Sequence, residues 1–88
     1  ETILDLKSEY EKKIISLGKK TKPAHKLLLF LFSEPIISVN QAAEHLGIGF
    51  PAASRMVSDF QKLDILKEKT GFSRNRYFSL YEYLDLFR

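Results

Sequence analysis

Side chains able to hydrogen-bond phosphate oxygens and base edges are concentrated in two segments of the second half of the chain. One segment begins at Pro51 and carries basic and hydroxyl side chains at helical spacing; the other follows Gly71 and carries two Arg. Guanidinium and ammonium groups bind phosphates, and Arg also reads guanine edges. The N–H groups at a helix start can hold a phosphate as well. The expected nucleic-acid contacts are Pro51, Ala52, Ser54, Arg55, Ser58, Lys62, Arg74 and Arg76.

Some of these basic residues allow a second interpretation. Arg55 is the best placed for a base or phosphate contact, but it can also be an ordinary solvated residue. Arg76 can pair with Glu68 across a hairpin instead of meeting a partner. Lys12-Lys13 and Lys19-Lys20 are predicted to be a solvated helix face and a linker rather than a binding patch.

Two short helices are predicted to position the first segment. Ser38 and Gln41 stand at the spacing of a capping box, and Gly47 can take the left-handed conformation that ends a helix. Pro51 opens the next helix, in the first turn, where proline is tolerated. Two helices joined by a tight turn indicate a helix-turn-helix, whose second helix enters the DNA major groove.

The remaining elements follow from periodicity and breakers. An apolar stripe predicts a first helix that ends near Gly18, and a dense apolar run predicts a central helix over about 23–34. Alternating residues predict a strand pair, 65–70 and 76–80, around a turn at 71–75. A short final helix should pack back on the core. The expected fold class is α+β and mostly helical: a winged helix-turn-helix with an extra N-terminal helix and a two-stranded wing.

Composition argues against several other classes of protein. The chain has no Cys, so disulfides and Cys-based metal sites are excluded, which fits a cytoplasmic protein. Its longest apolar run is far too short to cross a bilayer. Its two His are predicted to lie on different helices, and its glycines form no phosphate-binding loop. We therefore expect no cofactor, no metal, no membrane partner and no catalytic residue. The net charge of +3 permits nucleic-acid binding without requiring it.

Beyond these patterns, the chain resembles the C-terminal domain of Fic-family proteins, whose N-terminal domain transfers AMP from ATP to protein hydroxyls. The resemblance runs from Ala24 to Phe87, about three quarters of the chain. It is carried by the segments 38–48, 51–55, 63–66, 70–78 and 83–85. The most characteristic is the Gly-x-x-Arg-x-Arg-aromatic-aromatic run that begins at Gly71. The helix-turn-helix part by itself also fits many bacterial repressors.

The resemblance implies that the parent protein is a Fic-type protein adenylyltransferase with AMPylation activity. The family's His-Pro-Phe and Gly-Asn-Gly-Arg motifs are absent here, so this piece is expected to be non-catalytic and cut from a longer chain. Residues 1–20 would be the helical connector to the catalytic Fic domain, and residues 21–88 the winged helix-turn-helix domain. The stripe of the connector would pack on the winged helix, on the catalytic domain, or on a second copy as a homodimer.

We therefore expect a regulatory module that binds double-stranded DNA. The alternative is a protein-interaction or substrate-recruiting module that does not bind DNA. One position departs from the pattern: Asp64 stands where winged-helix repressors often carry Gly, which argues against a tight left-handed turn before the first wing strand.

Overall fold

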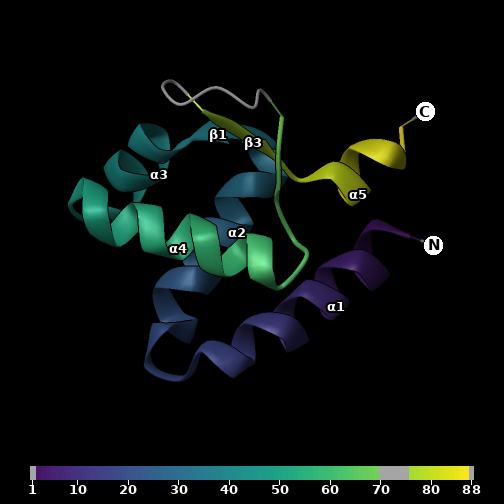
Figure 1. The fold of residues 1–88 in the computed structure, drawn as a ribbon. Coiled ribbons are helices and arrows are strands. Elements are labelled where there is room, and N and C mark those ends of the chain that lie inside the picture. The colour runs from purple at the N-terminus through teal and green to yellow at the C-terminus, as the bar shows by residue number, and fades with distance from the viewer. Residues whose placement is uncertain (1, 70–75, 88) are drawn as a thin grey trace.

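Helices dominate residues 2–69 and 76–87, the part of the chain that the computed structural model describes, and three short strands form one small antiparallel sheet (Figure 1). The α+β, mostly helical fold class predicted from the sequence is confirmed. Along the chain the elements are α1 (Ile3–Ile14), the 3-10 helix η1 (Ile15–Lys20), α2 (Thr21–Ser33), β1 (Ile36–Ser38), α3 (Val39–Leu46), α4 (Phe50–Lys62), β2 (Lys67–Glu68), β3 (Tyr77–Ser79) and α5 (Tyr81–Asp85). None of the helices in this part of the chain combines the length and apolar character needed to cross a bilayer.

The first helix buries its apolar stripe within this chain. Leu6, Tyr10 and Ile14 of α1 are fully or almost fully buried, so of the three predicted places for the stripe, the rest of the chain takes it. The α-helix ends at Ile14, earlier than predicted, and continues as η1. Within η1, Gly18 has a φ of +62°, which turns the chain toward α2. The Thr21 hydroxyl donates to the carbonyl of Ile14 at 3.2 Å and ties the two ends of this turn together.

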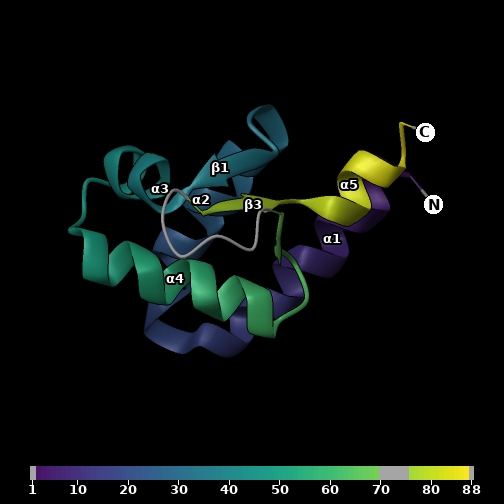
Figure 2. The same cartoon turned by 45° about the horizontal axis from the view of Figure 1, so that its top comes forward.

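Helix α2 runs through the middle of the molecule and packs against α1, η1 and α3 (Figures 1 and 2). Four of its apolar residues are completely buried: Ala24, Leu27, Leu28 and Leu31. The prediction of a central helix is confirmed, although Leu29 stays 46% exposed. Pro23 lies in the first turn, as predicted.

The helix pair α3–α4 follows the predicted local signals closely. The Ser38 hydroxyl accepts from the backbone N–H of Gln41 at 3.2 Å, and the Ser38 N–H donates to Gln41 Oε1 at 2.8 Å, so the capping box is confirmed. Gly47 ends α3 with a φ of +67°. Helix α4 begins at Phe50, one residue before Pro51. Its inner face is buried through Ala53, Met56, Val57 and Phe60.

The sheet has one strand more than predicted. Its order is β1-β3-β2, all antiparallel, with Ile37 opposite Phe78 and Glu68 opposite the same Phe78 on the other side. Strand β1 is only three residues long, too short to show an alternating pattern in the sequence. The two predicted strands are present but shorter, at 67–68 and 77–79. The predicted turn at 71–75 lies outside the described residues.

The prediction for Asp64 is wrong. Asp64 has a φ of +65° and forms a left-handed turn directly after α4, although it carries a side chain. Asp tolerates this conformation better than bulkier residues do, because its short polar side chain clashes less with the backbone. Tyr81 secures the turn by donating its hydroxyl to the Asp64 carbonyl at 3.2 Å. Burial, together with the hydrogen bond to Asp64, raises the pKa of Tyr81 to about 12.

The short helix α5 returns to the core near the start of α1, as Figures 1 and 2 show. Its Tyr83 ring packs edge-on against Phe32 of α2 at 5.1 Å between centroids. Phe32 in turn lies 6.3 Å from the ring of Tyr10 on α1. The predicted packing of the final helix on the core is therefore confirmed, with the helix beginning at Tyr81.

Candidate functional site

The outward face of α4 presents the residues predicted for it. Pro51, Ser54, Arg55 and Lys62 are exposed, and Ala52 and Ser58 are half-buried at its border. Since the opposite face of the same helix is buried, α4 packs one face against the core and exposes the other to solvent. Arg55 has no ion pair or hydrogen bond within the part of the chain that the structure describes. Its guanidinium is therefore available to a partner.

The start of α4 combines open backbone donors with an apolar side chain. Gly49 is the N-cap residue and supplies no side-chain cap, and Pro51 has no N–H to satisfy. The N–H groups of Phe50 and Ala52 consequently face the end of the helix without intrahelical acceptors. The Phe50 side chain is 54% exposed beside them. The two N–H groups can donate hydrogen bonds to an anion, and the Phe50 side chain can contact an apolar group.

The strands behind α4 offer less free charge than predicted. Arg76 is exposed, but its Nη2 lies 2.5 Å from Oε1 of Glu68. This hydrogen bond raises the pKa of Arg76. Its guanidinium also lies 5.3 Å from the centroid of the Phe78 ring. Of the two interpretations of Arg76, the pair with Glu68 is the one observed, whereas Arg74 lies outside the described residues.

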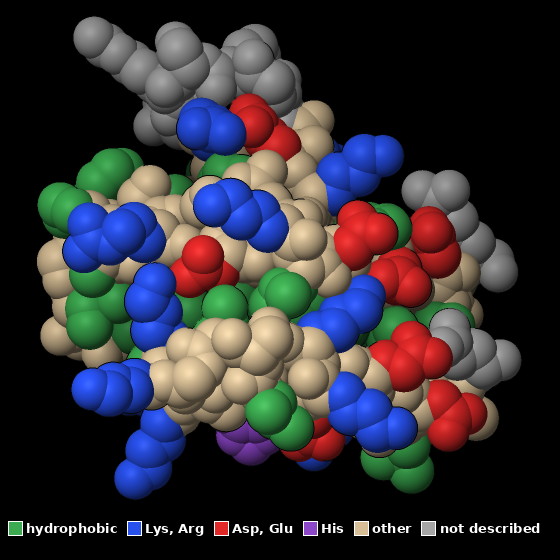
Figure 3. Space-filling model, turned by 60° about the horizontal axis from the view of Figure 1, so that its bottom comes forward, with side chains coloured by type: hydrophobic (Ala, Val, Ile, Leu, Met, Phe, Trp, Pro, Cys, Tyr) green, Lys and Arg blue, Asp and Glu red, His purple; other side chains and the backbone are tan. Residues whose placement is uncertain are grey.

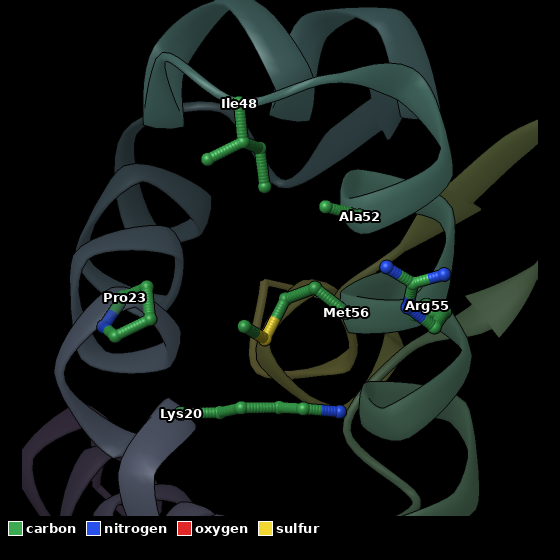
Figure 4. A pocket seen from close by; sticks show the side chains of 6 residues that line it. All are labelled: Lys20, Pro23, Ile48, Ala52, Arg55 and Met56. Atoms are coloured by element: carbon green, nitrogen blue, oxygen red, sulfur yellow. The ribbon is translucent and has the colours of Figure 1, made fainter.

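Lys20 joins the site although its sequence position predicted a linker. Its Nζ lies 3.3 Å from Oδ2 of Asp59, one helical turn after Arg55 on α4. The Lys20 chain thus reaches from η1 across to α4, as Figure 4 shows. No sequence pattern links two residues that are 39 positions apart; the contact exists because the turn at Gly18 brings η1 beside α4.

Basic side chains dominate the surface around this contact. Figure 3 shows Lys and Arg spread across one face of the molecule, whereas most of the visible acidic side chains gather toward its right side. The exposed basic residues of η1, the start of α2, and α4 are Lys19, Lys20, Lys22, Lys26, Arg55 and Lys62. In residues 15–33 and 50–62 the only acidic residue is Asp59, which Lys20 neutralises. This surface therefore carries a local excess of positive charge.

A recess of about 210 Å³ lies between the two basic elements. Its walls are Pro23 of α2, Ile48 of the α3–α4 connection, and Ala52 and Met56 of α4, while Lys20 and Arg55 stand at its edge (Figure 4). Ala52 was predicted to contact nucleic acid, and no pattern in the sequence indicated that it would line a recess together with Met56.

The two histidines lie apart, in structural contacts. His25 Nε2 on α2 is 2.9 Å from Oε2 of Glu11 on α1. The exposed ring of His45 on α3 stacks on Phe30 of α2, with centroids 4.0 Å apart. Within residues 2–69 and 76–87, no three His, Cys, Asp or Glu side chains come together as a metal site would require.

Comparison with known proteins returned no match, whether among protein families, curated proteins or solved structures. Functional inference for this chain therefore depends on the geometry and charge described above.

Proposed function

We propose that this chain is a winged helix-turn-helix module that binds double-stranded DNA through the outward face of α4. The observation that carries the proposal is the exposed basic surface over α4 and η1, in which the single carboxylate is already paired. The positive charges of such a surface attract phosphates, and its carboxylate, which is already paired with Lys20, adds little repulsion. The order of the elements supports the wing, because the β2–β3 strand pair directly follows α4 and β1 joins it to the segment before α3.

In the proposed complex α4 lies in the major groove, which is wide enough for a helix. Arg55 is the contact to a base edge or phosphate, with the Ser54 hydroxyl beside it. Lys62 lies two turns further along, roughly 10 Å away on the helix axis, and would reach a second phosphate. Lys20 approaches the backbone from η1 on the flank of α4. Arg74 and Arg76 remain proposed contacts for the flanking DNA, although Glu68 competes for Arg76.

The resemblance to Fic-family proteins extends this proposal to the parent. In that setting the module is the cytoplasmic, non-catalytic regulatory domain of a protein adenylyltransferase, with the catalytic Fic domain of the same chain as a further partner. A homodimer through residues 1–20 would use the outer side of α1, because the inner side is buried within the chain.

A protein-docking role is the second candidate, and one observation favours it. Phe50 is 54% exposed at the start of α4, and Tyr77 on β3 is 42% exposed. Exposed aromatic residues of this kind are enriched in contacts between proteins. In this alternative the module recruits a protein substrate or the catalytic domain and never meets DNA.

A fluorescence-anisotropy titration with random duplex DNA, at low and physiological salt, separates the two candidates. DNA binding predicts an affinity that falls as salt rises, and Arg55→Gln should reduce the slope of log K against log salt by about 0.9. Lys12→Gln on α1 removes the same charge from an exposed position outside the proposed surface and should leave the slope unchanged. Wild-type affinity no tighter than about 1 mM at low salt would favour protein docking.

A further inference from the structure

The recess between η1, α2 and α4 is built from apolar groups with cations at its edge. Met56 is only 5% exposed and forms its floor, while Pro23, Ile48 and Ala52 converge on it from three different segments. Figure 4 shows the Ile48 and Met56 side chains reaching toward the same space and the Lys20 chain closing its lower side. The walls thus present carbon and sulfur atoms, whereas nitrogen is confined to the rim.

The charges at the rim add to one net positive charge. Lys20 and Arg55 supply two cations, and Asp59, 3.3 Å from Lys20 Nζ, supplies one carboxylate. Because Asp59 pairs with Lys20, Arg55 is the cation left without a counter-charge. A ligand that fits this rim carries one negative charge beside an apolar body.

We propose that this recess binds a small monocarboxylate whose body is a single ring or a short branched chain. Its volume of about 210 Å³ sets the size of the ligand. An apolar protein cavity of about 150 Å³ holds one benzene molecule, and pockets for drug-sized ligands begin at roughly 300 Å³. The body of the ligand would lie against Met56 and Ile48, and its carboxylate would accept hydrogen bonds from the Arg55 guanidinium.

Binding of a carboxylate at this site would not require DNA, but it would use Arg55, which also belongs to the proposed DNA-facing surface. A bound carboxylate neutralises that guanidinium, so occupancy should weaken a DNA complex that uses it. This consequence rests on the proposed function, whereas binding of the carboxylate does not. The two are therefore measured separately.

The chain carries its own probe for the site, because Met56 is its only methionine. A sample labelled with ¹³C-methyl methionine gives one methyl resonance, from the floor of the recess. We would titrate it, in the absence of DNA, with benzoate, with benzamide as a neutral ligand of the same shape, and with acetate as a charge without a body. Benzoate should shift the resonance saturably with a Kd of about 1 mM or tighter. Benzamide should bind about three- to fivefold more weakly, as expected for loss of a partly solvated ion pair, and acetate should cause no saturable shift.

Two variants test the assignment of the groups. Arg55→Gln should abolish the preference for benzoate over benzamide, while Lys62→Gln on the same helix should preserve it. Ala52→Val narrows the recess and should weaken both aromatic probes. The unliganded methyl resonance of each variant reports whether the surrounding packing is intact. The proposal is overturned if no probe gives a saturable shift, or if wild-type protein binds benzoate and benzamide equally. Persistence of the benzoate preference in Arg55→Gln would also overturn it. A failure to bind DNA would contradict the proposed function but not the proposed carboxylate site.

Discussion

Glu68→Gln on β2 is expected to strengthen DNA binding, even though it removes an ion pair. In the folded chain Glu68 accepts a hydrogen bond from Arg76 and neutralises its guanidinium. Glutamine can still accept this hydrogen bond but carries no charge. Arg76 would then present its full charge next to the proposed DNA flank, and one carboxylate would no longer repel the phosphates.

The size of both effects follows from the exposure of the pair. The Arg76 and Glu68 side chains are 45% and 22% exposed, so solvent screens their attraction. The stability of the folded chain should therefore change little when the pair is lost. In DNA binding, one additional phosphate contact steepens the slope of log K against log salt by about 0.9, so that a fourfold rise in salt should weaken the variant roughly 3.5-fold more than wild type.

Anisotropy titrations at several salt concentrations measure this slope, and urea unfolding measures the stability. Glu9→Gln on the exposed surface of α1 is the matched control, because it changes the net charge equally at a distance from β2 and β3. An equal gain in DNA affinity in Glu9→Gln would mean that the effect comes from the overall charge of the chain and not from Arg76. Glu68→Gln protein that binds DNA no more tightly than wild type, with an unchanged slope, would refute the role assigned to Arg76.

Three further predictions concern the elements that hold α4 in place. Ser38→Ala removes the acceptor of the Gln41 N–H and should lower the free energy of unfolding by about 1 kcal/mol, visible as a lower urea midpoint; an unchanged midpoint would contradict the role of the cap. Asp64→Gly should be more stable than Asp64→Ala by about 1 kcal/mol, because the φ of +65° strains alanine but not glycine; equal stability would show that this turn is not strained. Tyr81 has a folded pKa of about 12 against an ordinary value of 10, so its stabilising contribution is complete below pH 10 and is lost as the pH rises toward 12. Ultraviolet titration of tyrosinate should accordingly show a group that ionises near pH 12 and that Tyr81→Phe removes.

The parts of the fold that were predictable are those set by hydrogen bonds between near neighbours in the sequence. Ser38 with Gln41 and Gly47 defined both ends of α3, because each acts within one turn of the chain. Asp64 shows the limit of such rules: glycine is the usual residue for a left-handed turn, yet Asp64 adopts the same conformation, and the Tyr81 hydroxyl donates a hydrogen bond to its carbonyl. Strand β1 was not predicted because the three residues after Pro35, the last of which caps α3, are too few to show a period, and only pairing with β3 makes them a strand.

The sequence predicted the part of the candidate site that lies on one helix, but not the part that depends on contacts between distant segments. The exposed side of α4 follows from helical spacing, so the exposure of Arg55 and Lys62 could be predicted from the sequence. The contact between Lys20 and Asp59, and the recess above it, depend on where η1 lies after the turn at Gly18, and that is a property of the tertiary packing.

In the two proposals made for this chain, α4 has two binding sides rather than one. The positions toward solvent alone, such as Ser54 and Lys62, can serve only a partner that covers the helix from outside. The positions toward η1, such as Ala52 and Met56, can serve only a group small enough to enter the recess. Arg55 stands where the two sides meet, exposed to solvent and at the edge of the recess at once. Its charge can be neutralised from either side but not fully from both, so two ligands that use it must compete, with no conformational change needed to couple them.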